Sequence, residues 1–320
     1  MASRTRDLVQ RAASIAIIGG VAYFFFRAFR RNWAEIEAAK LKLDYPLLLV
    51  AASFMLVCYL LSTYAWRATV NTLSAPQKLT FSESVATFNA SGLTKYLPGK
   101  FWSYALQMYW LSGAGFSKAM VVYANVVNLV ISIVTTVLLG LVCLAFSSTR
   151  PPIQLVLAAL AVVVVVDLCI IKFYSSVFGG LVKLVNRWLK RELGYFELSA
   201  RFMLELHVIY LLSGVAAGAS TYLVCLSIGV WPAPRDAALV VASSLISEVI
   251  GFLAVIVPGG LGVREGVMYL MLKADSLGSL PLVLPLASRA VNMLVDIGLG
   301  LVAIKLLRSF MKNGLEKPSQ

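Results

Sequence analysis

The sequence predicts an all-α polytopic membrane protein with about six full transmembrane helices and two re-entrant hairpins arranged as an inverted repeat. Of its 320 residues, 60% are hydrophobic and 13% are charged, and the mean hydropathy is +0.84. These values lie outside the range of soluble globular domains. Several apolar runs also reach the length of about 20 residues that crosses roughly 30 Å of hydrocarbon.

Six apolar runs are long enough to be full spans. We expect crossings at about 8–29, 46–70, 119–147, 153–173, 206–231 and 281–309. The first run follows Arg4 and Arg6 as a signal peptide would, but it ends in aromatic residues and has no small-residue cleavage site. We therefore predict a retained first span.

Two short segments combine helix breakers with fixed charges inside apolar sequence, 95–100 (KYLPGK) and 257–265 (VPGGLGVRE). Their breaker residues are Pro98, Gly99, Pro258, Gly259, Gly260 and Gly262. Proline removes a backbone donor and glycine tolerates positive φ, so a helix that reaches either segment should stop and turn. At membrane depth, non-helical backbone is tolerated only where it is buried inside the protein or lines a water-filled cavity. Each segment is therefore the expected tip of a re-entrant hairpin.

The two halves of the chain match at a nearly constant offset, which indicates an internal repeat within one transmembrane domain, 1–320. Thr63-Tyr64 recurs as Thr221-Tyr222, Ala75-Pro76 as Ala233-Pro234, and Pro98-Gly99 as Pro258-Gly259. The predicted repeats are 8–147 and 153–310, each with three full crossings and one hairpin. Because three is odd, the second repeat should enter the membrane from the opposite side, as in many transporters.

The formal net charge of +13 indicates a membrane-surface partner and not nucleic acid. Lysine and arginine lie at span ends and in short loops, outside any aromatic-interleaved soluble patch, so anionic lipid headgroups are the expected partner. Basic segments at 172–201 and 305–317 favour cytoplasmic termini in the plasma (inner) membrane, although the basic segment 27–42 then falls outside. The four cysteines lack metal-ligand or redox spacing and are expected to pack.

Arg264 and Glu265 follow the second break directly and are the first candidates for a substrate site. Free amides at a helix amino terminus, together with a guanidinium, form an anion site suited to a phosphate headgroup. The alternative is a mutual Arg264–Glu265 pair that only pins the hairpin. Lys95 and Lys100 flank the first break, where each either binds phosphate as a point charge or snorkels to the interface.

The last span carries Arg289, Asn292 and Asp296 at i, i+3 and i+7, on one helical stripe. Ionisable groups inside a span are costly and normally face a cavity or each other, so this stripe is a candidate substrate path. The alternative is a structural bond from Arg289 to Glu248 or to Asp296. Glu248 also belongs to the candidate substrate-binding set, and either carboxylate, Glu248 or Asp296, is a candidate proton carrier.

Other polar positions within the spans carry less specific signals. Asn125 and Asn128 lie three residues apart on one face of the third span and join the candidate substrate-binding set. Asp167 and Glu83 lie near span ends, where solvated or capping roles are expected. His207, beside Glu205, is expected at the interface with a surface role.

The sequence offers no metal cluster, nucleotide-binding loop or pair of catalytic carboxylates. An intramembrane dyad of His207 and Ser220 is excluded because thirteen residues place them nearly four helical turns apart. We therefore expect no metal, no cofactor and no catalytic residue, and we do not expect an enzyme.

The motifs at 95–100 and 258–265 resemble the lysylphosphatidylglycerol synthase transmembrane-region family, over about 41–307. The resemblance implies a flippase-like fold that moves an amphiphilic lipid between leaflets, with Arg264 and Glu265 lining the path. One departure is that we expect no soluble aminoacyl-transfer domain after the last span, so the substrate need not be an aminoacylated lipid.

These observations predict a transporter that moves an anionic phospholipid or a polyprenyl-linked glycolipid between leaflets through a central polar cavity. A glycosyltransferase or synthase is a candidate partner, and the oligomeric state is left open. The alternative is an integral-membrane transferase acting on such lipids, or an accessory subunit of an envelope glycolipid synthesis complex. A transferase normally needs a carboxylate or histidine in a loop at the membrane surface, and the loops offer only Asp236, Asp275 and Glu197.

Overall fold

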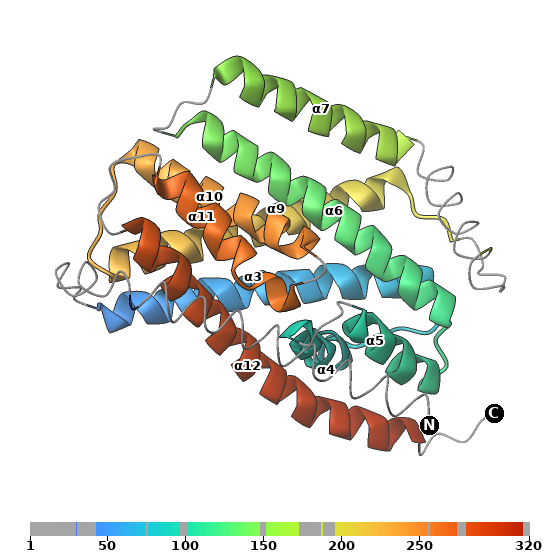
Figure 1. Ribbon diagram of the computed structural model, residues 1–320. Helices are drawn as coiled ribbons and strands as arrows, with labels where there is room; N and C mark the ends of the chain where they lie inside the picture. Colours follow the sequence, from blue (N-terminus) through green and yellow to red (C-terminus); the bar gives the residue numbers. More distant parts are fainter. Residues whose placement is uncertain are drawn as a thin grey trace, which may run out of the picture.

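The computed structural model describes residues 43–74, 76–96, 101–147, 152–172, 196–254, 257–273 and 280–315, with the isolated residues 30 and 187. The expected first span at 8–29 lies outside these residues, as do Pro98, Gly99 and Lys100 of the first break and Asp275. In the described part the chain is entirely helical, as predicted (Figure 1).

Two sets of four helices are separated along the chain by α7, Ile153–Lys172. The first set comprises α3 (Tyr45–Leu73), α4 (Phe81–Gly92), α5 (Trp102–Gly113) and α6 (Lys118–Ala145). The second comprises α9 (Ala200–Ser227), α10 (Pro234–Leu253), α11 (Val263–Lys273) and α12 (Leu280–Leu315). Single 3-10 turns, η1 (Leu93–Tyr96) and η2 (Pro258–Gly260), follow α4 and α10.

Several helices begin at capping residues that the sequence supplies locally. Asp44 accepts a hydrogen bond from the Leu47 amide at the start of α3, and Ser199 accepts one from Phe202 at the start of α9. Thr80 and Glu83 form a capping box at the start of α4. The capping role expected for Glu83 is therefore confirmed.

This is a multi-pass membrane protein with six candidate spans among the described residues. Five agree with expected crossings, and the sixth is α10. We expected this segment to be one arm of the re-entrant hairpin whose tip is the second break, because its serines make it more polar than the other spans. The 20-residue helix is nevertheless long and apolar enough to cross. The hydroxyls of Ser243 and Ser247 donate to carbonyls three residues earlier in the helix, which satisfies them without water. The 12-residue α4 is much shorter, at about 18 Å, so the two hairpins are unequal.

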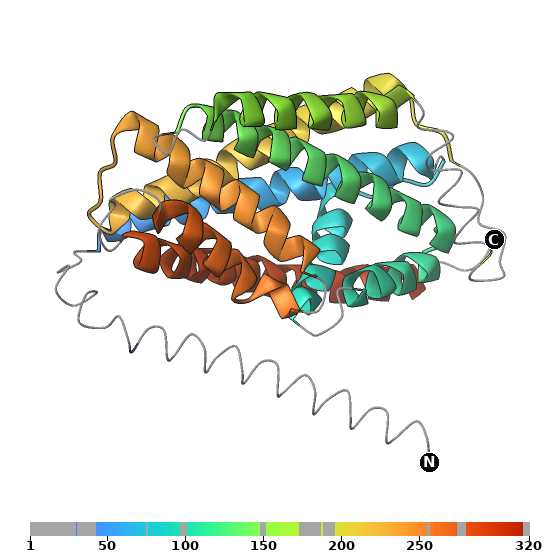
Figure 2. The same cartoon turned by 45° about the horizontal axis from the view of Figure 1, so that its top comes forward.

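The helix pairings follow a pattern of exchange between the two sets. The long helices α3 and α9 pack against each other, α10 packs on α6, and α4 packs on α12. When α3, α4, α5 and α6 are exchanged with α9, α10, α11 and α12 in that order, the α3–α9 pair maps onto itself and every other observed pair of these helices maps onto a second observed pair. Helix α7 packs mainly on α6 and lies at the edge of the bundle in both ribbon views (Figures 1 and 2).

Two of the buried apolar clusters join helices from both sets. One includes Ala51 of α3, Val224 of α9, Met268 of α11 and Leu284 of α12. The other connects α3 and α6 with α9. A further cluster, around Trp66 of α3, lies within the first set.

Candidate functional site

The turn that precedes the first break lies against the second break. Turns η1 and η2 are in contact, and Gly259 has a φ of 57°. A Cβ at Gly259 would lie 3.2 Å from Nη2 of Arg289 and 3.4 Å from Cδ1 of Tyr96. Glycine therefore provides both the turn and the close approach of η1, η2 and α12.

The second break also packs on the backbone of α10. Gly260 has a φ of 65°, and a Cβ there would lie 2.6 Å from the carbonyl oxygen of Gly251. A Cβ at Gly251 would in turn lie 2.9 Å from Cβ of Arg264. This packing places the first turn of α11 against α10.

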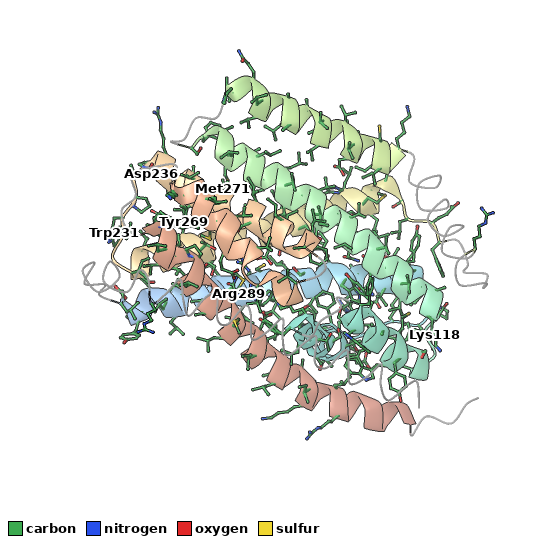
Figure 3. All side chains as sticks on the ribbon, viewed as in Figure 1. Lys118, Trp231, Asp236, Tyr269, Met271 and Arg289 are labelled. Carbon is green, nitrogen blue, oxygen red and sulfur yellow. The ribbon has the colours of Figure 1, made fainter. Side chains whose placement is uncertain are left out.

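Six charged residues meet around these breaks, and we call them the charge cluster: Lys95, Glu248, Arg264, Glu265, Arg289 and Asp296. They come from η1, α10, α11 and α12. Arg289 lies between the end of the bundle marked by Trp231 and Asp236 and the end marked by Lys118 (Figure 3). Arg289 therefore lies away from both ends of the bundle.

Glu265 connects the start of α11 to α12. Its Oε2 accepts a hydrogen bond from the Gly262 amide at 2.7 Å, and its Oε1 lies 3.0 Å from Nη1 of Arg289. The same Nη1 donates to the carbonyl oxygen of Gly259 at 3.1 Å. The predicted alternative bonds from Arg289 to Glu248 or to Asp296 are therefore wrong.

Arg264 pairs with Glu248 of α10. The predicted Arg264–Glu265 pinning pair is wrong because adjacent residues on a helix do not face each other. Both amide atoms of Asn292 have hydrogen-bond partners when its amide oxygen faces Arg264. The oxygen then accepts hydrogen bonds from Nη1 at 3.1 Å and from Nη2 at 2.7 Å. Its amide nitrogen then donates to the carbonyl of Ser288. The buried guanidinium thus has one charged and one neutral acceptor.

Asp296 connects α12 to the first break. Its Oδ2 lies 2.5 Å from Nζ of Lys95 and accepts a hydrogen bond from the Tyr96 hydroxyl at 2.6 Å. The Lys95 ammonium also lies 5.2 Å from the centroid of the Tyr59 ring, within cation–π range. The contacts of Lys95 and Tyr96 with Asp296 therefore connect η1, which follows α4 of the first set, to α12 of the second set.

The charge cluster is electrically balanced, with three cations and three carboxylates, but its exposure is uneven. The side chains of Arg264, Glu265 and Arg289 are buried or nearly so. The side chains of Glu248 and Lys95 are 55% and 41% exposed. The charge cluster therefore reaches the protein surface at one carboxylate and one ammonium group.

Asn125 and Asn128 lie in a separate buried network. Asn125 donates to Oε1 of Gln107 at 2.8 Å, and Gln107 donates to Ser91 at 2.8 Å. Asn128 accepts from the Tyr210 hydroxyl at 2.8 Å. These bonds join α4, α5, α6 and α9, so the two asparagines have structural partners here and do not contact the charge cluster through these bonds.

Asp167 and His207 form a pair that the sequence did not predict. His207 Nε2 lies 3.0 Å from Asp167 Oδ1, and both side chains are largely buried between α7 and α9. The expected solvated role of Asp167 and surface role of His207 are therefore wrong. Glu205, beside His207, pairs instead with Arg201 at 3.2 Å.

Some residues of the site were missed from sequence. Tyr59 and Tyr96 contact Lys95 or Asp296. Tyr59 does not differ in sequence from the other aromatic residues in the spans, whereas Tyr96 lies inside the segment 95–100 but was not predicted as a site residue. Gln107 carried a weak signal as an amide inside the apolar α5. The hydroxyl of Ser220, whose dyad with His207 is excluded above, donates to the carbonyl of Ala51 at 2.8 Å.

Comparison with known proteins identifies a family. No curated protein matches the chain significantly. The model of the family described as the lysylphosphatidylglycerol synthase TM region matches residues 11–300. This match extends the motif resemblance toward the amino terminus, over the segment expected to hold the first span. The chain therefore belongs to the lysylphosphatidylglycerol synthase TM region family.

Proposed function

We propose that the protein moves an anionic lipid between membrane leaflets, with the charge cluster as the headgroup site. The observation that carries this proposal is the buried guanidinium of Arg264, held where the turns η1 and η2 meet in a bundle of candidate membrane spans. Ionisable groups in such a bundle are costly and are retained mainly for a functional or pairing role. The headgroup phosphate of an anionic phospholipid or of a polyprenyl-linked glycolipid would complement the positive charge of the Arg264 guanidinium.

Arg264 and Lys95 are the cations best placed to meet a phosphate. The Arg264 guanidinium can present two parallel N–H donors to phosphate oxygens, which is the strongest geometry for this group. The Lys95 ammonium is partly exposed and acts as a point charge. Arg289 donates to the carbonyl of Gly259 and to Glu265, which is buried, whereas the carboxylate partner of Arg264, Glu248, is 55% exposed. We therefore assign Arg289 the role of holding the break in place.

Transport would proceed by rocking of two inverted repeats, 8–147 and 153–310. The exchange pattern of helix pairings supports the repeat. The contact of Lys95 and Tyr96 with Asp296 joins one repeat to the other, whereas the Arg264–Glu248 and Arg289–Glu265 pairs lie within the second repeat. Rocking would therefore open the Lys95–Asp296 contact first and leave the Arg264 site intact.

A reconstitution assay tests this function. The purified full chain is placed in liposomes with acyl-labelled phosphatidylglycerol or a labelled short-chain polyprenyl-phosphate sugar, and dithionite quenches the label on the outer leaflet. We expect a protein-dependent loss of the inner-leaflet label, and slower loss for labelled phosphatidylcholine. No movement of any lipid, together with chemically altered lipid recovered from the vesicles, would favour the transferase instead.

A further inference from the structure

We propose that Glu248 is a built-in competitor for the lipid headgroup at Arg264. Its carboxylate pairs with the Arg264 guanidinium when no lipid is bound, and it turns away from Arg264 when a lipid phosphate binds there. This inference rests on the proposed function. It assigns to Glu248 the control of headgroup affinity and release.

The two acceptors on Arg264 differ in their freedom to move. Asn292 is buried and is also bound to the carbonyl of Ser288, so it stays with the guanidinium. Glu248 lies on α10 with more than half of its side chain exposed, and its flexible side chain has room to turn away. Glu248 is therefore the acceptor that an incoming anion can replace.

The other two carboxylates of the charge cluster are held more firmly. Glu265 is buried and binds both Arg289 and the Gly262 amide. Asp296 binds Lys95 and the Tyr96 hydroxyl. Replacing either one would break two contacts at once, whereas Glu248 has Arg264 as its ion-pair partner.

A phosphate and the Glu248 carboxylate need the same donors. Both are anions that bind a guanidinium through paired oxygens, and two like charges at one cation repel each other. The cation paired with Glu248 is Arg264, so an arriving phosphate competes with the carboxylate for that guanidinium.

The competition has a consequence for transport. A carrier must bind its substrate strongly enough to take it up and weakly enough to let it go. When Glu248 returns to Arg264, it displaces the headgroup and restores the neutral charge cluster. Removing the carboxylate should therefore tighten binding and slow translocation together.

The test compares Glu248→Gln with the wild type in the full chain. Glutamine keeps the size of the side chain and one oxygen for Arg264 but removes the charge. The probe is acyl-labelled short-chain phosphatidylglycerol, with its Kd measured by fluorescence anisotropy in neutral detergent and its translocation measured in liposomes. Glu205→Gln is the matched control because it removes the same charge from a surface pair with Arg201.

We expect Glu248→Gln to lower the Kd by about fivefold to tenfold, within the usual range of coupling between two competing ligands. Translocation should slow by a similar factor, while Glu205→Gln matches the wild type. If Glu248→Gln fails to fold, Glu248→Asp replaces it. Its carboxylate is one methylene shorter and should give a smaller decrease in Kd.

Three results would overturn the inference in different ways. A higher Kd for Glu248→Gln, or for Glu248→Asp in its place, would make Glu248 a positioning residue for Arg264. An unchanged Kd, with binding still lost in Arg264→Gln, would leave the headgroup site standing without a competitor. Equal binding by the wild type and Arg264→Gln would contradict the proposed function, and the inference would fail with it.

Discussion

The guanidinium of Arg289 lies 3.0 Å from the carboxylate of Glu265, and both side chains are buried. The two residues belong to different helices, and the pair fixes the first turn of α11 against the last long helix, α12. Arg289 also donates to the carbonyl of Gly259 in the break itself. The pair therefore holds the second break in the position from which Arg264 meets Glu248 and Asn292.

Arg289→Met should destabilise the protein by about 3 kcal/mol, because removing one partner of a buried pair leaves the other charge uncompensated. The measurement is reversible unfolding in detergent micelles, or the melting temperature where unfolding is irreversible. Glu265→Met should behave similarly. The double variant should lose less stability than the two single losses added together, and additive losses would contradict a direct pair.

Gly260→Ala should lower both stability and translocation, because its Cβ would lie 2.6 Å from the Gly251 carbonyl oxygen at a φ of 65°. The control is Gly266→Ala in α11, where a Cβ meets nothing within 4 Å. Alanine there should be neutral or stabilising by up to about 1 kcal/mol. The measurement is the melting temperature of each variant. Equal melting temperatures for Gly260→Ala and Gly266→Ala would show that the close packing of the break does not contribute to stability.

Asp167→Ala should loosen α7, because the Asp167–His207 pair joins this peripheral helix to α9. Hydrogen bonds between membrane helices contribute about 0.6 kcal/mol on average, so we expect a loss of roughly 1 kcal/mol and faster hydrogen exchange along α7. Cys169→Ala, an exposed position on the same helix, is the control. Unchanged exchange in Asp167→Ala would mean that apolar packing alone holds α7.

Gln107→Leu should cost about 1–2 kcal/mol, because it removes the partner of both Ser91 and Asn125 in a buried network. Asn125 keeps its bond to the carbonyl of Val121, so a complete loss of folding is not expected. Thermal unfolding measures the cost. If translocation fell while stability stayed the same, the network would belong to the lipid path and not to the scaffold.

The sequence predicted the helices and breaks better than the contacts between them. Apolar runs and proline–glycine breaks act locally, so the five described expected spans and the second break appear as predicted. The interacting pairs of polar side chains could not be predicted in this way, because their members are far apart in the chain. Arg289 and Glu265 are 24 residues apart, and Tyr96 and Asp296 are 200 apart. Helix α10 was underestimated because its serine hydroxyls bond within the helix.

The most direct test of the headgroup site is the initial rate of phosphatidylglycerol translocation by Arg264→Gln in liposomes. Arg201→Gln is measured beside it as the control, since Arg201 is an exposed arginine on α9. Loss of one charge-assisted contact, worth about 1.5–3 kcal/mol, predicts a fall of about tenfold or more for Arg264→Gln. Its melting temperature should fall less than that of Arg289→Met, because the carboxylate left behind, Glu248, is 55% exposed. A folded Arg264→Gln protein that moves lipid at the wild-type rate would contradict the account, and a variant that only unfolds would reduce Arg264 to a structural role.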